Sequence, residues 1–219
     1  KYTDFFKVAS SDINFYPMLK ELSKSKKKVI ISSGMSNIGE ILFLKKIFKK
    51  KKITVLHCIS SYPTKLNEVQ IKNMLEIKKR FGVKIGFSDH TNSFEAAISA
   101  TALGATMIEK HLTLNKKMKG PDHASSLDTS EFVNFVKSIR NTEKILKFRD
   151  NKISNDEFNN SKLVRKSIVA KTKIKKGEKF SRKNITTKRP GNGISAGKWF
   201  KVLNKVAKKN FKPDDLIKI

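Results

Sequence analysis

The sequence lacks the features of membrane-spanning, exported or disulfide-bonded proteins. Its 219 residues include a single cysteine, Cys58, so no disulfide can form within the chain and a reducing compartment suits it. There is no run of about eighteen apolar residues, and the first residues, Lys1 to Asp4, lack the apolar centre of a signal peptide. We therefore expect a cytoplasmic protein without a membrane segment, in which Cys58 is a small buried residue.

Acidic residues are also scarce. The chain has 19 Asp and Glu against 48 Lys and Arg, a formal net charge of +29, and such an excess can indicate nucleic acid as a partner. However, the lysines are spread along the chain, with runs at residues 26–28 and 49–52 between apolar segments. Zinc-finger spacing, aromatic RNP patterns and an obvious recognition helix are all lacking. We expect a solvated, lysine-rich surface. Attraction of anionic substrates is a lesser contribution, and nucleic-acid binding is the least favoured alternative.

The 38% of hydrophobic residues can form the core of one large domain or of two smaller ones. In the first part of the chain, five short apolar or β-branched segments are each followed by polar residues and then by a helical pattern. The segments are residues 5–9, 29–31, 53–58, 83–87 and 105–108. Helical patterns between them include residues 67–80 and the alanine-rich residues 93–103. Such alternation predicts parallel βαβ units, with a sheet buried on both faces.

Polar residues stand at the C-terminal end of each predicted strand. The clusters are Ser10-Ser11-Asp12, Ser32-Ser33-Gly34, Ser60-Ser61-Tyr62, Ser88-Asp89-His90 and Glu109-Lys110-His111. An α/β barrel builds its active site from the C-terminal ends of several strands, whereas a doubly wound sheet uses only a few of them at a switch point. We therefore favour the barrel. Since a closed barrel needs eight strands and the chain begins with Lys1 rather than Met, we expect three N-terminal units to be missing.

The chain changes character after these units. Residues 129–147 have the apolar spacing of an amphipathic helix, and residues 148–161 are polar, which suggests a linker. From residue 162 onward, short strand-like pieces alternate with Gly, Pro and Lys, as expected for a small, irregular β-rich domain. The expected organisation is a barrel part at 1–147, a linker at 148–161 and a β-rich domain at 162–219.

Seven short motifs, in order along almost the whole chain, resemble a known family. They are Phe6-Lys7-Val8-Ala9-Ser10, Ser32-Ser33-Gly34-Met35, His57-Cys58-Ile59-Ser60-Ser61-Tyr62-Pro63-Thr64, Gly86-Phe87-Ser88-Asp89-His90-Thr91, Ile108-Glu109-Lys110-His111, Gly120-Pro121-Asp122-His123 and Lys188-Arg189-Pro190-Gly191-Asn192-Gly193-Ile194-Ser195. Together they are similar to the N-acetylneuraminate (sialic acid) synthases and their legionaminic and pseudaminic acid relatives. The resemblance implies an α/β fold: a partial (β/α)8 TIM barrel holding the last five βα units, followed by an antifreeze-like SAF domain of the β-clip type. It also implies a domain-swapped homodimer, in which the SAF domain covers the partner's active site.

The reaction that the resemblance implies joins phosphoenolpyruvate and water to N-acetylmannosamine and yields N-acetylneuraminate and phosphate. An alternative acceptor in the same reaction class is a 6-deoxy-diacetamido sugar, as in legionaminic or pseudaminic acid synthases. Two alternatives come from other classes. One is a basic nucleic-acid-binding protein, and the other is an inactive fragment whose five units leave strand edges and apolar faces exposed.

His90 and His111 are the candidate metal ligands and two of the candidate catalytic residues. They follow successive strands, and the two-residue alternation along each strand sends both histidines to one face. Imidazole suits Mn²⁺, Zn²⁺ or Co²⁺ more than Mg²⁺. The resemblance favours Mn²⁺, with Mg²⁺ or Co²⁺ as alternatives, to polarise the sugar aldehyde and orient water. His57 falls on the other face of its strand and His123 follows a Gly-Pro-Asp turn, so both are left out of the metal set.

The donor substrate needs groups that bind phosphate and carboxylate. Lys7 is a mobile cation, and hydroxyls come from neighbouring strand ends at Ser10, Ser32 and Ser88. A serine at a strand end can serve only to form a turn, but the convergence of three favours binding. In the family a second lysine and a glutamate lie on earlier strands, and this chain has no counterpart for either.

The remaining candidates belong to the reacting centre and the sugar site. Asp12 stands where the best-known relatives carry a glutamate, and it can act as a general base or instead cap the following helix. By resemblance, Tyr62 and Asp122 bind the amino sugar, and Ser60 replaces an asparagine there. Arg189 lies on a loop fixed by proline and glycine. The resemblance implies that it reaches the neighbouring subunit's site and bonds to the N-acetyl group.

Overall fold

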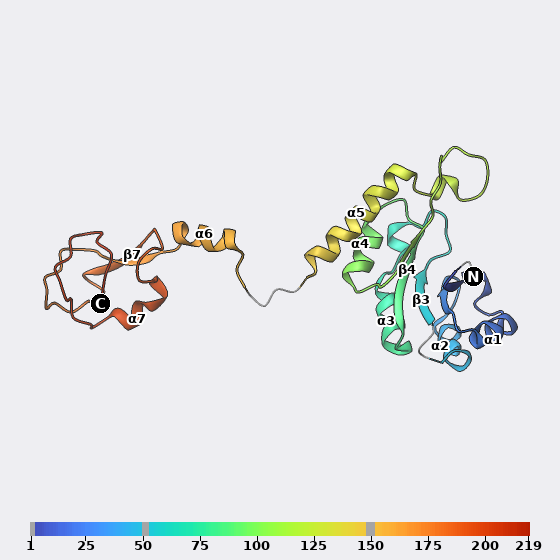
Figure 1. Cartoon of the computed structure of the whole chain (residues 1–219), viewed down its shortest axis with the longest axis horizontal. Coiled ribbons are helices and arrows are strands. Elements are labelled where there is room, and N and C mark those ends of the chain that lie inside the picture. The colour runs from blue at the N-terminus through green and yellow to red at the C-terminus, as the bar shows by residue number, and fades with distance from the viewer. Residues whose placement is uncertain (1–2, 50–52, 148–151) are drawn as a thin grey trace. The chain divides into compact units, whose positions relative to one another are not determined.

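The computed structural model describes residues 3–49, 53–147 and 152–219, which form two compact units, Lys1–Phe148 and Arg149–Ile219. The first unit is built on one parallel sheet in which strands adjacent in sequence are adjacent in space (Figure 1). Its strands are β1 (Phe5–Val8), β2 (Lys28–Ser32), β3 (Ile53–Cys58), β4 (Lys84–Asp89) and β5 (Ile108–Lys110). The strands are parallel because each connection returns the chain to the same end of the sheet, and strands consecutive in sequence commonly pair.

A helix follows every strand of this sheet. The helices are α1 (Tyr16–Lys24), α2 (Ile38–Ile47), α3 (Lys72–Phe81), α4 (Glu95–Ala102) and α5 (Thr129–Ile145), with short 3₁₀ turns η1 (Ser10–Asp12), η2 (Leu66–Glu68) and η3 (His123–Ser125). α2 and α5 begin with capping boxes, in which Asn37 and Asp128 accept a backbone N–H and a glutamate bonds back. α3 ends at Gly82, whose φ of 71° is the left-handed conformation that terminates helices.

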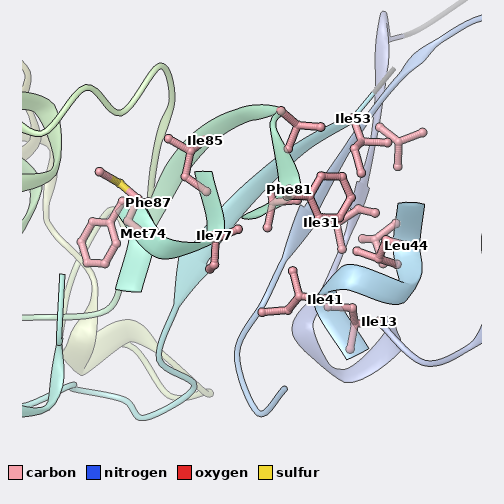
Figure 2. Packing of buried hydrophobic residues seen from close by; sticks show 14 of the residues in the cluster. Ile13, Ile31, Ile41, Leu44, Ile53, Met74, Ile77, Phe81, Ile85 and Phe87 are labelled. Atoms are coloured by element: carbon pink, nitrogen blue, oxygen red, sulfur yellow. The ribbon is translucent and has the colours of Figure 1, made fainter. Parts of the chain in front are cut away.

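The core of the first unit lies between the sheet and its helices (Figure 2). Leu44 of α2 and Met74 and Phe81 of α3 are buried there with Ile31 and Ile85 of the sheet. Burying each such side chain contributes about 1.5–3 kcal/mol. The helices therefore cover the outer side of the sheet, and the strand side chains of opposite parity are left for the inner side.

The largest differences from the predicted boundaries are at the fifth strand and at the third helix. The fifth strand covers Ile108–Lys110 rather than residues 105–108, because pairing depends on backbone groups and continues through two charged residues that the apolar pattern did not include. The preceding connection already bonds to β4, with Thr106 N donating to Ile85 O at 2.8 Å. The predicted helix 67–80 is interrupted at Gln70, whose φ of 45° separates η2 from α3.

The parallel sheet curls, so side chains from distant strands meet. In a flat sheet, four spacings of about 4.8 Å would put β1 and β5 roughly 19 Å apart. Instead, Lys7 Nζ of β1 lies 3.3 Å from Glu109 Oε2 of β5. Ser10 Oγ, after β1, lies 3.5 Å from Cys58 Sγ at the end of β3. The first unit is therefore a partial (β/α) barrel, which confirms the predicted fold class.

The second unit is small and combines a two-stranded sheet and single bridges with short helices. Its elements are α6 (Asn155–Val164), β6 (Ser167–Ala170), β7 (Ile185–Lys188), η4 (Ala196–Lys198) and α7 (Trp199–Val202). β6 and β7 pair antiparallel, and single bridges join further segments, such as Ile174 with Phe211. The core contains Phe180 edge-on to Phe211, with ring centroids 5.8 Å apart. This irregular β-rich domain agrees with the sequence prediction.

Part of the expected linker is helical. Residues 148–151 lie outside the described residues, but residues 155–161 belong to α6. The helix starts at a capping box, where Ser154 Oγ accepts a hydrogen bond from Glu157 N at 3.2 Å. This cap satisfies backbone N–H groups at the start of the helix, and the polar composition of the segment did not reveal it. No residue of α6 is buried, and the domain boundaries at 147 and 162 stay predictions. No helix in the described ranges has the length and apolarity needed to span a membrane.

Leu44→Ala is expected to lower the free energy of unfolding of the first unit by about 2–5 kcal/mol, because Leu44 is fully buried and its truncation leaves a cavity. The matched control is Leu75→Ala on α3, where the residue is 36% exposed and a smaller loss is expected. Urea unfolding followed by far-ultraviolet circular dichroism measures both changes. Equal losses would contradict the assigned helix faces.

Candidate functional site

Polar side chains from several strands meet on the inner side of the curled sheet, at the C-terminal strand ends. The register of β4 and β5 sets Ser88 opposite Glu109. Ser88 Oγ donates to Glu109 Oε1 at 2.7 Å, and the same carboxylate pairs with Lys7 at 3.3 Å. Because side chains alternate along a strand, His90 and His111 follow Ser88 and Glu109 on this side.

Three aromatic rings cluster at these strand ends. The centroids of His90 and His111 are 5.1 Å apart, and the Tyr62 ring lies 4.2 Å from the first and 5.5 Å from the second. His90 Nδ1 lies 2.8 Å from Ile59 O, a partner that only accepts. A proton on Nδ1 leaves the lone pair of the neutral ring on Nε2. His111 Nδ1 lies 3.7 Å from Asp122 Oδ2.

The protonation states follow from burial and from contacts within the cluster. Burial, and then the charge of His90, lower the pKa of His111, so its imidazole stays neutral near pH 7. Burial opposes the charged form of His90, but hydrogen bonds, first with Cys58, outweigh it and raise the pKa. Burial also opposes ionisation of Cys58, but contacts led by that with His90 lower the thiol pKa. Burial raises the pKa of Tyr62, which therefore keeps its phenolic proton for donation.

Among the described residues, the imidazoles of His90 and His111 are the side chains at this position that could bind a metal ion. No group of three or more His, Cys, Asp or Glu side chains in the described ranges could hold a metal ion. A site at His90 and His111 thus fits an ion that keeps coordination positions open for substrate and water, as catalytic metals do. The hydrogen bond from His90 to Ile59 fits this use, because metal-binding histidines commonly donate their other N–H to such a partner.

Hydroxyl and ammonium groups lie beside the histidines. Lys7 brings its cation from β1, and Ser10 Oγ accepts a hydrogen bond from Gly34 N at 3.0 Å. The hydroxyls of Ser32 and Ser60 are buried and have no hydrogen-bond partner among the described residues. Buried polar groups normally have partners. These two hydroxyls therefore keep unused hydrogen-bonding capacity within the described part of the site.

Gly34 allows the serine hydroxyls to gather. A Cβ atom at this position would lie 2.3 Å from Ser60 Oγ and 2.8 Å from Ser10 Oγ, closer than side-chain atoms approach one another. Only glycine leaves the space that the strand-end serines of β1 and β3 share. Glycine is needed at this turn because a side chain would collide with the serines, and not because the backbone conformation requires glycine.

Three further predicted residues are half-exposed or exposed. Asp12 is half-exposed in η1, and the N-cap of α1 is Phe15 with no side-chain cap, so the capping alternative for Asp12 is wrong. Arg189 is exposed and follows β7 directly, in the second unit. Asp122 is exposed but contacts His111, and its φ of 68° is left-handed.

The two histidines outside the predicted metal set have protein partners. His57 is buried, with Nε2 2.8 Å from Val69 O, and burial lowers its pKa. His123 Nδ1 lies 2.8 Å from Thr113 Oγ1. Both rings are thus engaged in hydrogen bonds with groups outside the ring cluster.

Glu109 and Cys58 are members of the cluster that the sequence did not single out as site residues. Glu109 connects Ser88 with Lys7, and its position two residues before His111 was the available signal. Cys58 has no such signal. Its contact with Ser10 depends on the curl of the sheet, which strand patterns do not specify.

The chain is similar in sequence to known proteins along almost its whole length. It matches the sequence model of the NeuB family over residues 2–151 and that of the SAF domain over residues 165–219. It is 46% identical over 218 residues to N,N'-diacetyllegionaminic acid synthase of Campylobacter jejuni subsp. jejuni serotype O:2, covering 97% of this chain and 65% of that protein. Pseudaminic acid synthase of the same organism is 35% identical over 217 residues, covering 97% of this chain and 63% of that protein.

A solved structure also resembles the chain. It is N-acetylneuraminic acid (sialic acid) synthetase from Leptospira borgpetersenii serovar Hardjo-bovis in complex with citrate, with a TM-score of 0.66 and 31% identity. The match covers 73% of this chain and 56% of that chain. This chain thus spans less than two-thirds of the length of the relatives described here. The family match extends over most of it, and the chain belongs to the NeuB family.

Proposed function

We propose that the protein carrying this chain condenses phosphoenolpyruvate with an N-acetylated amino sugar and water, releasing phosphate. The observation that carries the proposal is the meeting of the His90–His111 pair with Lys7 and strand-end hydroxyls. One part of this cluster suits a metal-activated aldehyde, and the other suits a phosphorylated carboxylate. Membership in the NeuB family, with similar members named as sugar-acid synthases, supports the same reaction.

The reaction forms one carbon–carbon bond and one carbon–oxygen bond from water, and it breaks the donor's carbon–carbon π bond and its carbon–oxygen bond to phosphate. The methylene carbon of phosphoenolpyruvate attacks the sugar aldehyde, whose oxygen takes up a proton. Water then adds to the donor's second carbon, and the bond from that carbon to the phosphate oxygen breaks as the keto group forms. No oxidant or reductant is needed.

Residue roles follow from chemistry and placement. A divalent ion on His90 and His111, Mn²⁺ first and Mg²⁺ or Co²⁺ as alternatives, would polarise the aldehyde and orient water. Lys7 with Ser10, Ser32 and Ser88 would bind the charged donor. Glu109 would hold the Lys7 ammonium in place, since the two pair at 3.3 Å.

For the sugar, Tyr62 would donate its phenolic hydrogen, and Asp122 and Ser60 would accept or donate hydrogen bonds. Asp12 stays a candidate base for the water proton. Arg189 would act on the N-acetyl group from the second unit of a partner subunit, in a domain-swapped homodimer. Its guanidinium can donate to an amide oxygen, which suits that role.

We further propose a 6-deoxy-diacetamido sugar as the acceptor, in place of the N-acetylmannosamine that the sequence first indicated. The legionaminic acid synthase is 46% identical to this chain, whereas the sialic acid synthetase structure is 31% identical. Ser60, which replaces an asparagine of the best-known sialic acid synthases, is consistent with a changed sugar site.

Phosphate release from phosphoenolpyruvate is expected to require both an acceptor sugar and a divalent metal. In parallel assays of the protein at its full natural length, kcat/KM should be about tenfold or more higher for a 6-deoxy-diacetamido sugar than for N-acetylmannosamine, a difference of about 1.4 kcal/mol. A higher value for N-acetylmannosamine would reverse the acceptor assignment. No sugar-dependent phosphate release with any acceptor would reject the reaction.

His90→Ala and His111→Ala should each lower kcat/KM by about 100-fold or more, because a ligand to the ion that polarises the aldehyde is lost. His123→Ala is the matched control, since this histidine bonds to Thr113 instead and should leave the metal dependence unchanged. Titration of phosphate release with Mn²⁺ measures the effect. Native metal dependence in both alanine variants would show the assignment to be wrong.

Arg189→Ala should raise the KM of the acceptor about tenfold or more with little change for phosphoenolpyruvate, because a charged hydrogen bond contributes about 1.5–3 kcal/mol. Arg182→Ala, an exposed arginine of the same unit, is the control. Mixing Arg189→Ala with His90→Ala subunits tests the cross-subunit role. A mixed dimer should regain one site with the native acceptor KM, whereas an arginine acting within its own subunit would give no such site.

A further inference from the structure

A buried ion pair lies on the side of the sheet opposite the ring cluster. Lys110 Nζ is 3.1 Å from Asp89 Oδ2, and the two side chains are 1% and 0% exposed. The register of β4 and β5 sets these residues directly opposite each other. The Lys110 ammonium also lies 5.8 Å from the ring centroid of Phe135 in α5, so the pair is on the helix-covered side.

The pair holds the backbone of the residue that follows His90. Asp89 Oδ1 accepts a hydrogen bond from Thr91 N at 2.9 Å. Lys110 Nζ donates to Thr91 O. Lys110 therefore pairs with Asp89, the residue before His90, and bonds to Thr91, the residue after it. The residue after Lys110 is His111. One set of bonds thus connects the two strand ends that carry the histidines.

Stability alone does not explain a charged pair at this depth. Removing each ion from water costs several kcal/mol, and well-packed apolar residues of similar volume often give equal or greater stability. The hydrogen bonds of Asp89 Oδ1 and Lys110 Nζ to Thr91, however, have a defined length and direction, which apolar contacts lack. What the pair supplies that an apolar pair would not is a fixed distance between the ends of β4 and β5.

We propose that the Asp89–Lys110 pair positions His90 and His111 to bind one metal ion. The inference rests on the proposed function, because it takes these histidines as the metal ligands. Asp89 and Lys110 are positioning residues, since their side chains lie on the far side of the sheet and act through the histidine backbones. Because the described residues offer no third protein ligand there, the position of the ion depends on how firmly the two imidazole rings are held.

The double variant Asp89→Asn/Lys110→Met tests this role in the protein at its full natural length. It removes both charges at similar volume, and the amide oxygen can still accept from Thr91 N. Loss of such supporting groups typically weakens metal binding 10–100-fold, so we expect the Kd for Mn²⁺ to rise by about that factor. The free Mn²⁺ signal in electron paramagnetic resonance measures Kd, and the visible spectrum with Co²⁺ reports a changed coordination geometry.

The matched control is Glu76→Gln/Arg80→Met, which removes an exposed ion pair within α3 and should change neither readout. Unfolding by urea measures stability in parallel. If the buried double variant does not fold, Asp89→Glu takes its place, because it keeps the charge but displaces it by one methylene. That variant is expected to raise the Kd for Mn²⁺ about tenfold.

Two failures can be told apart with His90→Ala as a reference. A native Kd and Co²⁺ spectrum in the folded pair variant, with binding lost in His90→Ala, would overturn the positioning role and leave the proposed function intact. Native Mn²⁺ binding in His90→Ala would instead reject the metal site itself, and the positioning role with it. Weaker binding at unchanged stability supports the inference.

Discussion

Parallel pairing in register, combined with the curl of the sheet, is the constraint on which the first unit depends. Pairing brings the C-terminal ends of the five strands to one edge, and the curl brings the first and last strands within the reach of one ion pair, Lys7 with Glu109. The alternation of side chains then divides each strand end between two environments. Without the curl, the groups on β1 would lie roughly 19 Å from those on β5 and no common site would exist.

The two faces of the sheet carry different polar groups. On the inner side, Ser88 bonds to Glu109 and the rings of His90 and His111 meet, while the hydroxyls of Ser32 and Ser60 lack partners among the described residues. Every second residue faces the other way. There the ion pair of Asp89 and Lys110 is buried under α5, and both side chains bond to Thr91.

Sequence patterns predicted much of this arrangement, and their errors have physical causes. The parity of His90 and His111 along successive strands was enough to place both on one face. The fifth strand was placed too early because its pairing extends through Glu109 and Lys110, whose charges hide it from an apolar pattern. The expected linker contains a helix, because the capping at Ser154 is a short local signal within a polar stretch.

The sequence by itself determined the βα order, the family and the polar residues at each strand end, because strand periodicity and motif spacing are properties of neighbouring residues. Only the tertiary structure decided which of those residues meet. The contacts of Glu109 with Lys7 and of Cys58 with Ser10 join residues far apart in sequence. They depend on how strongly the sheet curls, a property of all five strands and their helices packed together and of no single segment.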